Sequence, residues 1–456
     1  MENTHKDVLI IGGGPAGYLA AERAAAGGLS VTLFEERAMG GVCLNEGCMP
    51  TKTLLHSAKI YDYAKNSAAY GVAAENVALN HNAVIDRKDK VVRTLVSGVE
   101  AKMRARKIEV INASAVILGR RDNSFLVEAA EKAYHGRHLM IATGSEAILP
   151  PISGAKEGID AGYVLTSREI LDLREVPAKL AVIGGGVIGL EMAAYFAMAG
   201  SKVVVIEMMD KIGGYIDDEI AAMLMKDLQK KGIEFHLGCK VTNISPKSLT
   251  YEKGGATTLI DTEIVLAAIG RAPRVTRIGL ETIGIHIECG CIVTDKHLRT
   301  NIPNVYAIGD INGKSMLAHT AYREAEVAVN HILGKRDNMR YDAIPSVIYT
   351  SPEIAAVGET EESASEKGMR YTVKKLSMRY SGRFIAENDG GDGVCKLLIE
   401  NGTNRLIGVH LLSSYSSEII YGAAMMIESR WQISNLKELV FPHPTVSEII
   451  RETLFV

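Results

Sequence analysis

The same local pattern occurs twice in this chain of 456 residues, and it restricts the fold more than any other feature. An apolar run is followed by a G-x-G-x-x-G triplet, a helical stretch, a second apolar run and a glutamate. Each glutamate, Glu35 or Glu207, stands 23 residues after the first glycine of its triplet, Gly12 or Gly184. Strand, glycine turn, helix and strand in this order predict a parallel βαβ unit that binds a dinucleotide.

Each part of this pattern has a physical role. The glycines permit a tight turn and close approach of a pyrophosphate, the helix N-terminus faces its negative charge, and the acid binds a ribose hydroxyl. Two such units imply two nucleotides bound at once, most simply a flavin and an exchangeable nicotinamide. The residues that we expect to bind them are Gly12, Gly14, Pro15, Ala16, Gly17, Glu35 and Glu36 in the first unit and Gly184, Gly186, Val187, Ile188, Gly189 and Glu207 in the second.

Two cysteines, Cys43 and Cys48, follow a glycine pair and precede Pro50 and Lys52. Five residues of ideal helix rise about 7.5 Å, whereas a disulfide spans roughly 4.4–6.8 Å between Cα atoms. A bridge here therefore requires an irregular turn. A bridge that closes so short a loop constrains the unfolded chain little, and strained, accessible disulfides are the reactive ones. We interpret the pair as a redox-active dithiol.

The alternatives for this pair are two buried free thiols or half of a metal site. Buried thiols are common, because cysteine is among the most buried residue types. Zinc sites usually place paired cysteines two to four residues apart and need a second ligand pair, which the sequence does not show. The surrounding motifs favour the redox interpretation.

Composition limits the classes of partner. Hydrophobic residues make up 47% and charged residues 23%, as in globular proteins, and the length suits about three domains. A net charge of −3 and only 5% aromatic residues argue against nucleic acid or an anionic membrane surface as a partner. The short polar start, Met1 to Asp7, leaves no room for a signal peptide, and no run of about 20 apolar residues occurs. Six cysteines suit a reducing compartment, so we expect a cytoplasmic protein.

The remaining segments predict three domains. Residues 83–106 predict a long charged helix, with strands on either side of Asn112, and a helix from Leu317 should complete the first nucleotide domain. The segment after Tyr341 is of α+β type, with strands at 347–349, 394–399 and 406–412 and helices at 415–428 and 445–453. We expect an α/β fold with two Rossmann-like domains, the first from residues 1–148 and 272–340 and the second from 149–271, and a C-terminal domain at 341–456.

Taken together, the chain resembles the pyridine nucleotide–disulfide oxidoreductases over essentially its whole length. The motifs that carry the resemblance, besides the two fingerprints, are G-G-x-C-x4-C-x-P-x-K (Gly40 to Lys52), A-T-G (Ala142 to Gly144), G-R-x-P (Gly270 to Pro273), Y-A-I-G-D ending at Asp310 and H-P-T-x-S-E (His443 to Glu448). The segment from Met316 to His319 and the run 345–353 resemble the lipoamide branch. The departures, which affect the walls of the substrate channel rather than the redox atoms, are Val42, Met49, Thr51, Phe441 and Pro442.

The resemblance implies roles for the redox residues. Cys48 is expected beneath the flavin of FAD as the charge-transfer thiolate, and Cys43 as the thiol that exchanges with substrate. His443, oriented by Glu448, is the expected base for the thiol. Lys52 is expected near the flavin N5 and paired with Glu191, and Asp310 at the ribityl chain. The further cofactor contacts that it implies are Gly41, Val42, Cys43, Lys52, Thr143, Gly144, Ser145, Gly270, Arg271, Gly309, Asp310, Met316, Leu317, Ala318 and His319.

The resemblance also implies an activity and an assembly. The expected enzyme is a homodimer that reoxidises protein-bound dihydrolipoyl groups and passes the electrons through Cys43, Cys48 and FAD to NAD⁺. Its C-terminal domain forms the twofold interface and supplies His443 to the partner's disulfide. The expected partner is the lipoyl-bearing carrier protein of a 2-oxoacid dehydrogenase, acetoin dehydrogenase or glycine cleavage complex.

Two alternative functions remain. Glutathione-type reductases share the disulfide motif but use NADPH, and the segment from Glu207 to Asp210 repels a 2′-phosphate instead of binding it. A flavoprotein scaffold subunit would not need an intact set of thiols, base and acid. The four other cysteines, which lack an acid, base or glycine setting, are interpreted as packing residues: Cys239, Cys289, Cys291 and Cys395.

Overall fold

The computed structural model describes residues 5–456 and confirms the mixed α/β class. The chain divides into two compact units. The first contains the chain up to Thr53, Asp86–Ile148 and Arg271–Arg340, and the second contains Leu54–Ile85, Leu149–Gly270 and Tyr341–Val456. The first strand, β1, begins at His5, so the first four residues of the polar start lie outside the described residues.

A seven-stranded sheet forms the core of the first unit, in the order β3-β2-β1-β6-β5-β4 with β19 also paired to β6. Strand β6 is long enough to have two partners on one side, β5 antiparallel along its first half and β19 parallel along its second. The strands are β1 (His5–Ile11), β2 (Val31–Phe34), β3 (Glu109–Ile111), β4 (Ala115–Arg121), β5 (Ser124–Ala129), β6 (Lys132–Ile141) and β19 (Val305–Ala307). Leu9, Leu139 and Val305 are fully buried between these strands.

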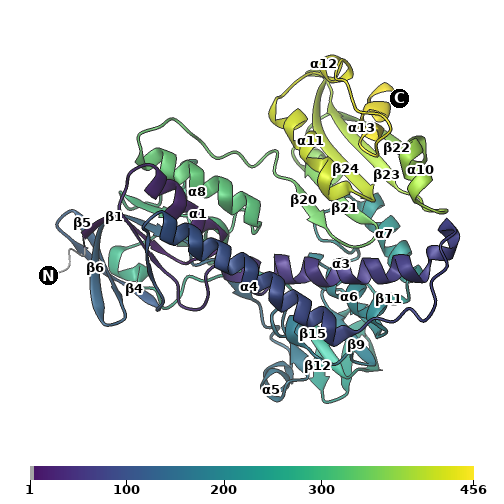
Figure 1. Ribbon diagram of the computed structural model, residues 1–456, viewed down its shortest axis with the longest axis horizontal. Helices are drawn as coiled ribbons and strands as arrows, with labels where there is room; N and C mark the ends of the chain where they lie inside the picture. Colours follow the sequence, from purple (N-terminus) through teal and green to yellow (C-terminus); the bar gives the residue numbers. More distant parts are fainter. Residues whose placement is uncertain (1–4) are drawn as a thin grey trace. The chain divides into compact units, whose positions relative to one another are not determined.

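Two helices far apart in the sequence pack together in the first unit. Figure 1 shows α1 (Pro15–Ala26) beside α8 (Ala318–Ile332), so the helix after Leu317 joins the first fingerprint as predicted. The remaining elements of this unit are α2 (Gly41–Asn45), η3 (Leu280–Ile283), η4 (Gly309–Asn312), the pair β7 (Ser145–Ala147) and β16 (Arg271–Pro273), and the hairpin of β17 (Ile287–Glu288) and β18 (Cys291–Ile292).

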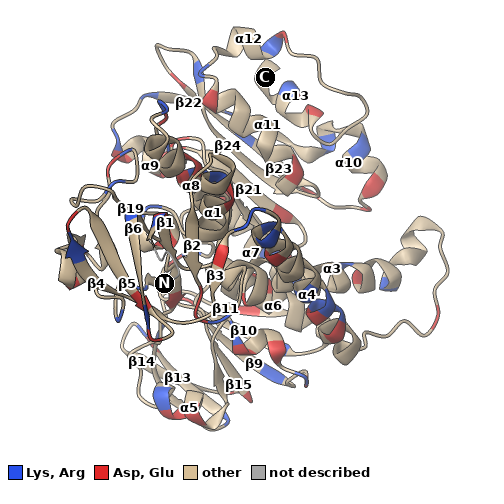
Figure 2. Ribbon diagram, turned by 60° about the vertical axis from the view of Figure 1, so that its left-hand side comes forward, with Lys and Arg blue, Asp and Glu red and all other residues tan. Residues whose placement is uncertain are grey.

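Two long helices, α3 (Cys48–Lys65) and α4 (His81–Ala105), run from one unit into the other. The observed bounds of α4 confirm the helix predicted at 83–106, and Figure 2 shows acidic and basic residues mixed along it. The short helix η1 (Ser67–Tyr70) follows α3. Among residues 5–456, no helix combines the length and apolarity that a membrane span requires.

The second fingerprint lies in a five-stranded parallel sheet of the order β11-β10-β9-β15-β8. Its strands are β8 (Val164–Leu165), β9 (Lys179–Ile183), β10 (Lys202–Ile206), β11 (Ile233–His236) and β15 (Ile264–Ala267), with α5 (Ala155–Ala161), η2 (Glu169–Asp172), α6 (Val187–Ala199) and α7 (Asp218–Lys230). A three-stranded antiparallel sheet, which the sequence did not reveal, follows as β12 (Lys240–Ser245), β13 (Ser248–Lys253) and β14 (Ala256–Asp261).

The C-terminal part of the second unit contains a five-stranded antiparallel sheet in the order β20-β21-β24-β23-β22. The strands are β20 (Ser346–Ile348), β21 (Glu353–Gly358), β22 (Tyr371–Ser377), β23 (Val394–Glu400) and β24 (Arg405–Ser413), and the helices are α9 (Glu361–Glu366), η5 (Met378–Tyr380), α10 (Gly382–Glu387), α11 (Ser416–Glu428), α12 (Ile433–Lys437) and α13 (Glu448–Phe455). The predicted strands at 394–399 and 406–412 are confirmed as β23 and β24. The last helix begins three residues later than predicted.

Candidate active site

The turn after β1 brings the backbone close to the first helix. Gly12 has φ of 109°, and a Cβ there would lie 2.2 Å from the carbonyl oxygen of Ala142, so only glycine fits. Gly14 caps α1 and Pro15 opens it, which leaves the first helical N–H groups directed outward. The second fingerprint repeats this geometry, because a Cβ on Gly184 would lie 2.5 Å from the carbonyl oxygen of Ala268. Both helix N-termini therefore suit a pyrophosphate.

The two predicted ribose-binding acids make matching hydrogen bonds. Glu35 accepts the N–H of Gly13 at 2.7 Å and that of Arg37 at 2.8 Å. Glu207 accepts the N–H of Gly185 at 2.6 Å and that of Met209 at 2.7 Å. Each carboxylate has further lone pairs that can accept ribose hydroxyls. The neighbouring Glu36 instead pairs with Arg274 and Ser114, which lower its pKa although burial opposes this.

The cysteine pair lies at a break between two helices. Helix α2 ends at Asn45 and α3 begins at Cys48, so the backbone makes the irregular turn that the spacing demanded. The side-chain amide of Asn45 donates to the carbonyl oxygens of Gly41 at 2.9 Å and Met39 at 3.1 Å and thereby fixes the end of α2. A Cβ on Gly41 would lie 2.6 Å from the Cα of Gly14, so the redox segment touches the fingerprint turn directly.

The thiols of Cys43 and Cys48 are hydrogen-bonded to each other. This bond, burial and the negative charge of Cys48 raise the pKa of Cys43, whereas the charge of Lys52 lowers it. Loss of a proton by one thiol therefore disfavours loss of a proton by the other. Such a pair can hold one thiolate, form a disulfide, or exchange with a substrate disulfide.

Two tyrosines that sequence reasoning missed lie in the electrostatic field of this pair. Tyr18 on α1 and Tyr322 on α8 are hydrogen-bonded through their hydroxyl groups, and both interact electrostatically with the two cysteines. Burial raises the pKa of each tyrosine, so both stay protonated at neutral pH. Tyr322 could have been found from helix periodicity, because it lies one turn after His319 on α8.

The predicted ribityl contact, Asp310, lies on η4 in a polar cluster. Ser145 donates to Asp310 at 2.5 Å, and Arg271 donates through Nε to the Ser145 hydroxyl at 2.8 Å. Burial raises the pKa of Asp310, while Ser145 and Arg271 oppose that rise. Glu324, which the sequence analysis did not identify, is fully buried and accepts the N–H of Gly309 at 2.6 Å, which fixes η4.

The remaining predicted contacts of the first unit surround this cluster. Gly144, like Ser145, follows strand β6, and Thr143 donates to the carbonyl oxygen of Arg274 at 2.9 Å. Met316 and Leu317 lead into α8, of which Ala318 and His319 are the first residues. Gly270, the corresponding residue of the second unit, follows β15.

The predicted base belongs to the second unit. Nδ1 of His443 lies 2.8 Å from Oε2 of Glu448, the first residue of α13. The imidazole is 78% exposed, whereas the glutamate is only 12% exposed. The carboxylate therefore orients the ring and leaves Nε2 to act on another group.

The predicted pairing of Lys52 with Glu191 stays a prediction, because Lys52 belongs to the first unit and Glu191 to the second. Glu191 is buried on α6 and accepts the backbone N–H of Tyr349 at 3.0 Å.

The packing interpretation of the other cysteines is correct for two residues and wrong for one. Cys239 and Cys395 are buried, Cys291 is half-buried, and Cys289 is exposed at a hairpin turn. Cys289 is exposed because the side chains of a two-residue turn project into solvent. Within residues 5–456, no cluster of three or more histidine, cysteine, aspartate or glutamate side chains could hold a metal ion.

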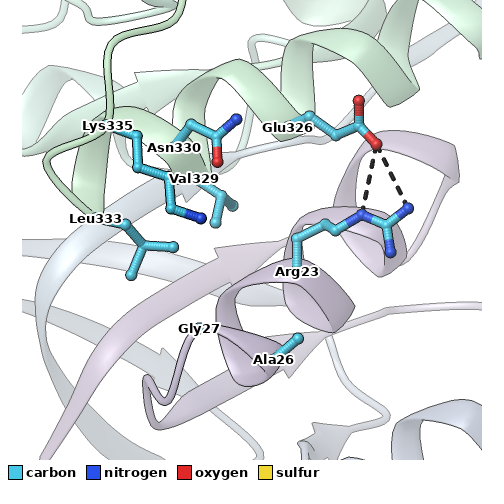
Figure 3. Close-up of a pocket in the computed structure, with 8 residues that line it drawn as sticks. All are labelled: Arg23, Ala26, Gly27, Glu326, Val329, Asn330, Leu333 and Lys335. Atoms are coloured by element: carbon cyan, nitrogen blue, oxygen red, sulfur yellow. Dashed lines mark hydrogen bonds and ion pairs between the residues drawn. The ribbon is translucent and has the colours of Figure 1, made fainter.

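One hollow of the first unit lies away from this chemistry. It is lined at the ends of α1 and α8 by Arg23, Ala26, Gly27, Glu326, Val329, Asn330, Leu333 and Lys335 (Figure 3). Arg23 bonds Glu326 at 3.4 Å, and the lining contains no cysteine or histidine. We assign it no role.

Comparison with known proteins identifies the family. Residues 6–325 match the model described as pyridine nucleotide-disulphide oxidoreductase, and residues 344–454 match the dimerisation domain of that family. The chain belongs to this family. It is a flavin-dependent disulfide oxidoreductase with FAD and a nicotinamide dinucleotide as cofactors, and its C-terminal domain forms a homodimer.

Similar proteins cover nearly the whole chain. The mitochondrial dihydrolipoyl dehydrogenase of Pisum sativum is 37% identical over 98% of this chain and 90% of its own. The dihydrolipoyl dehydrogenase of Bacillus subtilis is 35% identical over 98% of this chain and 95% of its own. The structure of the HOCl-induced flavoprotein disulfide reductase RclA of Escherichia coli is similar, with a TM-score of 0.85, 29% identity and 99% of both chains covered.

Proposed function

We propose that this oxidoreductase is an NAD-dependent dihydrolipoyl dehydrogenase. The observation that carries the proposal is the hydrogen-bonded thiol pair of Cys43 and Cys48 placed against the first glycine fingerprint. The 35–37% identity to dihydrolipoyl dehydrogenases along the chain supports the choice of substrate.

The residues of the first unit fit FAD. The N–H groups at the start of α1 suit its pyrophosphate, and Glu35 is oriented for the adenosine ribose. Asp310, buried beside Ser145 and Arg271, offers an acceptor for the hydroxyls of the ribityl chain. When bound, FAD supplies the two-electron chemistry that connects a dithiol to a nicotinamide.

The chain's own residues carry out the thiol exchange. A dihydrolipoyl thiolate attacks Cys43 of the oxidised Cys43–Cys48 disulfide, and Cys48 leaves as a thiolate. The second dihydrolipoyl sulfur then attacks the sulfur that is bonded to Cys43. The lipoyl disulfide is released, and Cys43 and Cys48 remain as the reduced pair with the two electrons.

His443 moves the protons of this exchange. Thiolate is the nucleophile, and the ordinary thiol pKa of about 8.5 makes a base necessary at neutral pH. His443 takes the thiol proton through Nε2, and Glu448 stabilises the imidazolium through Nδ1. We propose that this histidine acts on the disulfide of the partner chain.

The second unit accepts the nicotinamide dinucleotide. Glu207, fixed by two backbone N–H groups, accepts the ribose hydroxyls of NAD⁺ and repels the phosphate of NADP⁺. The physiological partner is a lipoyl-bearing carrier protein, and we place the enzyme in the reducing environment of the cytoplasm.

The test is a steady-state assay of the purified flavoprotein with NAD⁺ and dihydrolipoamide or reduced lipoylated carrier proteins. We expect turnover with NAD⁺, and one dithiol equivalent should turn the yellow protein red-orange. A protein that shows this colour change but does not turn over dihydrolipoamide would contradict the proposed substrate. The proposed disulfide chemistry would still stand.

The similarity to RclA favours a second candidate, a disulfide reductase with a substrate other than lipoamide. The same assay, run with NADH against lipoamide and glutathione disulfide, distinguishes the two. The dihydrolipoyl dehydrogenase assignment requires lipoamide to be the better substrate by at least about 100-fold in kcat/KM.

A further inference from the structure

The β17–β18 hairpin carries an unusual turn sequence. Its two strands are joined by Cys289 and Gly290, and both turn residues have positive φ, 48° and 77°. Positive φ at both central residues is typical of a type I′ turn, which favours Asn-Gly or Gly-Gly. Cys289 therefore occupies a conformation that L side chains with a Cβ adopt at a cost. Burial of the side chain does not offset this cost, because Cys289 is exposed.

The second thiol of the hairpin lies close to the first residue. Cys291 is half-buried, and its Sγ donates to the carbonyl oxygen of Cys289 at 3.6 Å. A Cβ built on Gly313 would lie 2.2 Å from this Sγ, so the sulfur lies against the residue that directly follows η4. One accessible thiol and one partly covered thiol therefore share a single turn.

The spacing allows the two sulfurs to join. Residues two positions apart have Cα atoms no more than about 7 Å apart even in an extended chain. A turn shortens that separation into the roughly 4.4–6.8 Å range that disulfides span. A disulfide explains this cysteine pair better than a metal site does, because the described residues offer no third ligand beside the pair.

We propose that Cys289 and Cys291 form a second redox-active thiol pair, separate from the catalytic one, which exchanges with low-molecular-weight disulfides of the glutathione type. The thiolate of Cys289 attacks the small disulfide, forms a mixed disulfide and releases one small thiolate. Cys291 then attacks the sulfur of Cys289 and releases the second. Two electrons pass to the small disulfide, and the two protons of the cysteines pass to its two thiolates.

Disulfide formation also changes the packing next to the flavin-binding residues. The sulfur of Cys291 lies against Gly313, which directly follows the 3-10 turn that carries Asp310, so a bond to Cys289 would form beside this turn. The hairpin thus connects the thiol redox state of the surroundings to the turn that holds a proposed FAD contact.

Peptide mapping of the full holoenzyme tests the pair. The reduced protein is incubated with glutathione disulfide, alkylated and digested with trypsin. The expected peptide, residues 278–296, contains both hairpin cysteines, whereas Cys43 and Cys48 fall in residues 38–52. We expect peptide 278–296 to become resistant to alkylation and two hydrogens lighter. Peptide 278–296 that stays fully alkylated, or that carries a stable glutathione adduct, would overturn the proposal.

Two single variants test the order of the steps. Cys291→Ser should trap a glutathione adduct on Cys289, because the resolving thiol is gone. Cys289→Ser should react about tenfold more slowly, because Cys291 is partly covered. Equal rates in the two variants would contradict the assigned roles. Turnover of dihydrolipoamide should stay within about twofold of wild type in both variants. A negative result for the hairpin thiols would therefore leave the proposed function untouched, and the reverse also holds.

Discussion

Oε2 of Glu448 lies 2.8 Å from Nδ1 of His443, and this contact is made entirely within one chain. The loop that carries the histidine is followed at once by α13, whose first residue is the glutamate. The ring is therefore oriented by the chain that supplies it, whichever disulfide it serves.

The first prediction concerns this pair. His443→Gln should lower kcat by about 10²–10⁴, the usual contribution of general acid–base catalysis. Glu448→Gln should lower kcat by roughly tenfold, because an amide can still orient the ring but does not stabilise imidazolium. Steady-state kinetics across pH measure both. Glu452→Gln, on the same helix but paired with Arg451, is the control and should match wild type.

The second prediction concerns the cofactor. Wild type should prefer NAD⁺ to NADP⁺ by at least about 100-fold in kcat/KM, which corresponds to roughly 2.7 kcal/mol. Glu207→Gln retains the size of the side chain and removes its charge, so it should narrow this preference to less than about tenfold. Asp210→Asn, which removes a nearby charge but not the predicted ribose contact, should narrow this preference less than Glu207→Gln does. Comparable kcat/KM values of wild type for the two cofactors would refute the role of Glu207.

The third prediction separates the two catalytic cysteines. Cys43→Ser and Cys48→Ser should each reduce lipoamide turnover to background while FAD stays bound, because Ser145 and Asp310 are unchanged. Only Cys43→Ser should retain the long-wavelength absorbance band that a thiolate at position 48 produces. Absorbance spectra of both variants measure this band. If only Cys48→Ser retained it, Cys43 would be the charge-transfer thiolate and Cys48 the thiol that exchanges with substrate.

The fourth prediction tests the shared site of the dimer. A heterodimer of a Cys43→Ser chain and a His443→Gln chain contains one doubly defective site and one intact site if His443 serves the partner. Separately tagged, co-purified heterodimers should then recover about half of the wild-type activity, while both homodimers are nearly inactive. No recovery would mean that each chain completes its own site.

The fifth prediction concerns a buried ion pair of the second unit. Lys396 and Asp217 are each 3% exposed and are joined at 2.8 Å, and Glu361 and Glu219 also pair with this lysine. Lys396→Met should destabilise the fold by about 3 kcal/mol, because it leaves the buried carboxylate of Asp217 without its cation. Urea unfolding measures this change. Lys375→Met, at a lysine that is 55% exposed and pairs with Glu219 at 2.8 Å, should change stability by less than about 1 kcal/mol.

The pH dependence of the Lys375 control has a defined sign. The hydrogen bond from Lys375 lowers the pKa of Glu219 below its ordinary value of 4.5. Stability from this carboxylate is therefore present above pH 4.5 and is lost as the pH falls through the folded pKa. The small difference in free energy of unfolding between wild type and Lys375→Met should disappear under those acid conditions. A difference that grows with acidity would contradict the assignment.

The sequence predicted the parts of the fold that depend on local patterns. Glycine spacing identified both βαβ units, and charge with helical periodicity identified α4, which the structure places at His81–Ala105. The irregular turn between Cys43 and Cys48 followed from disulfide geometry alone. Helix α13 began later than predicted because residues up to Ser447 form the loop that presents His443.

Other features depend on contacts between distant segments. In the sequence, Glu324 looks like an ordinary polar helix residue. Only the fold shows that its carboxylate accepts a hydrogen bond from the N–H of Gly309. Tyr18 and Tyr322 meet only because α1 packs on α8. Cys289 looked like a packing residue because a two-residue turn with positive φ at a cysteine contradicts local preference. The strands β12 to β14 were missed because each is short and rich in polar residues.

The matching hydrogen bonds of Glu35 and Glu207 bear on how long each nucleotide stays bound. A carboxylate already held by two backbone N–H groups does not collapse into its site when the ligand leaves. Both fingerprints therefore keep their shape without a nucleotide. Because they are alike in this respect, the fingerprints cannot explain why one nucleotide would stay bound while the other exchanges. On the proposed assignment, slow dissociation of FAD arises from contacts beyond the fingerprint, such as Ser145 and Asp310.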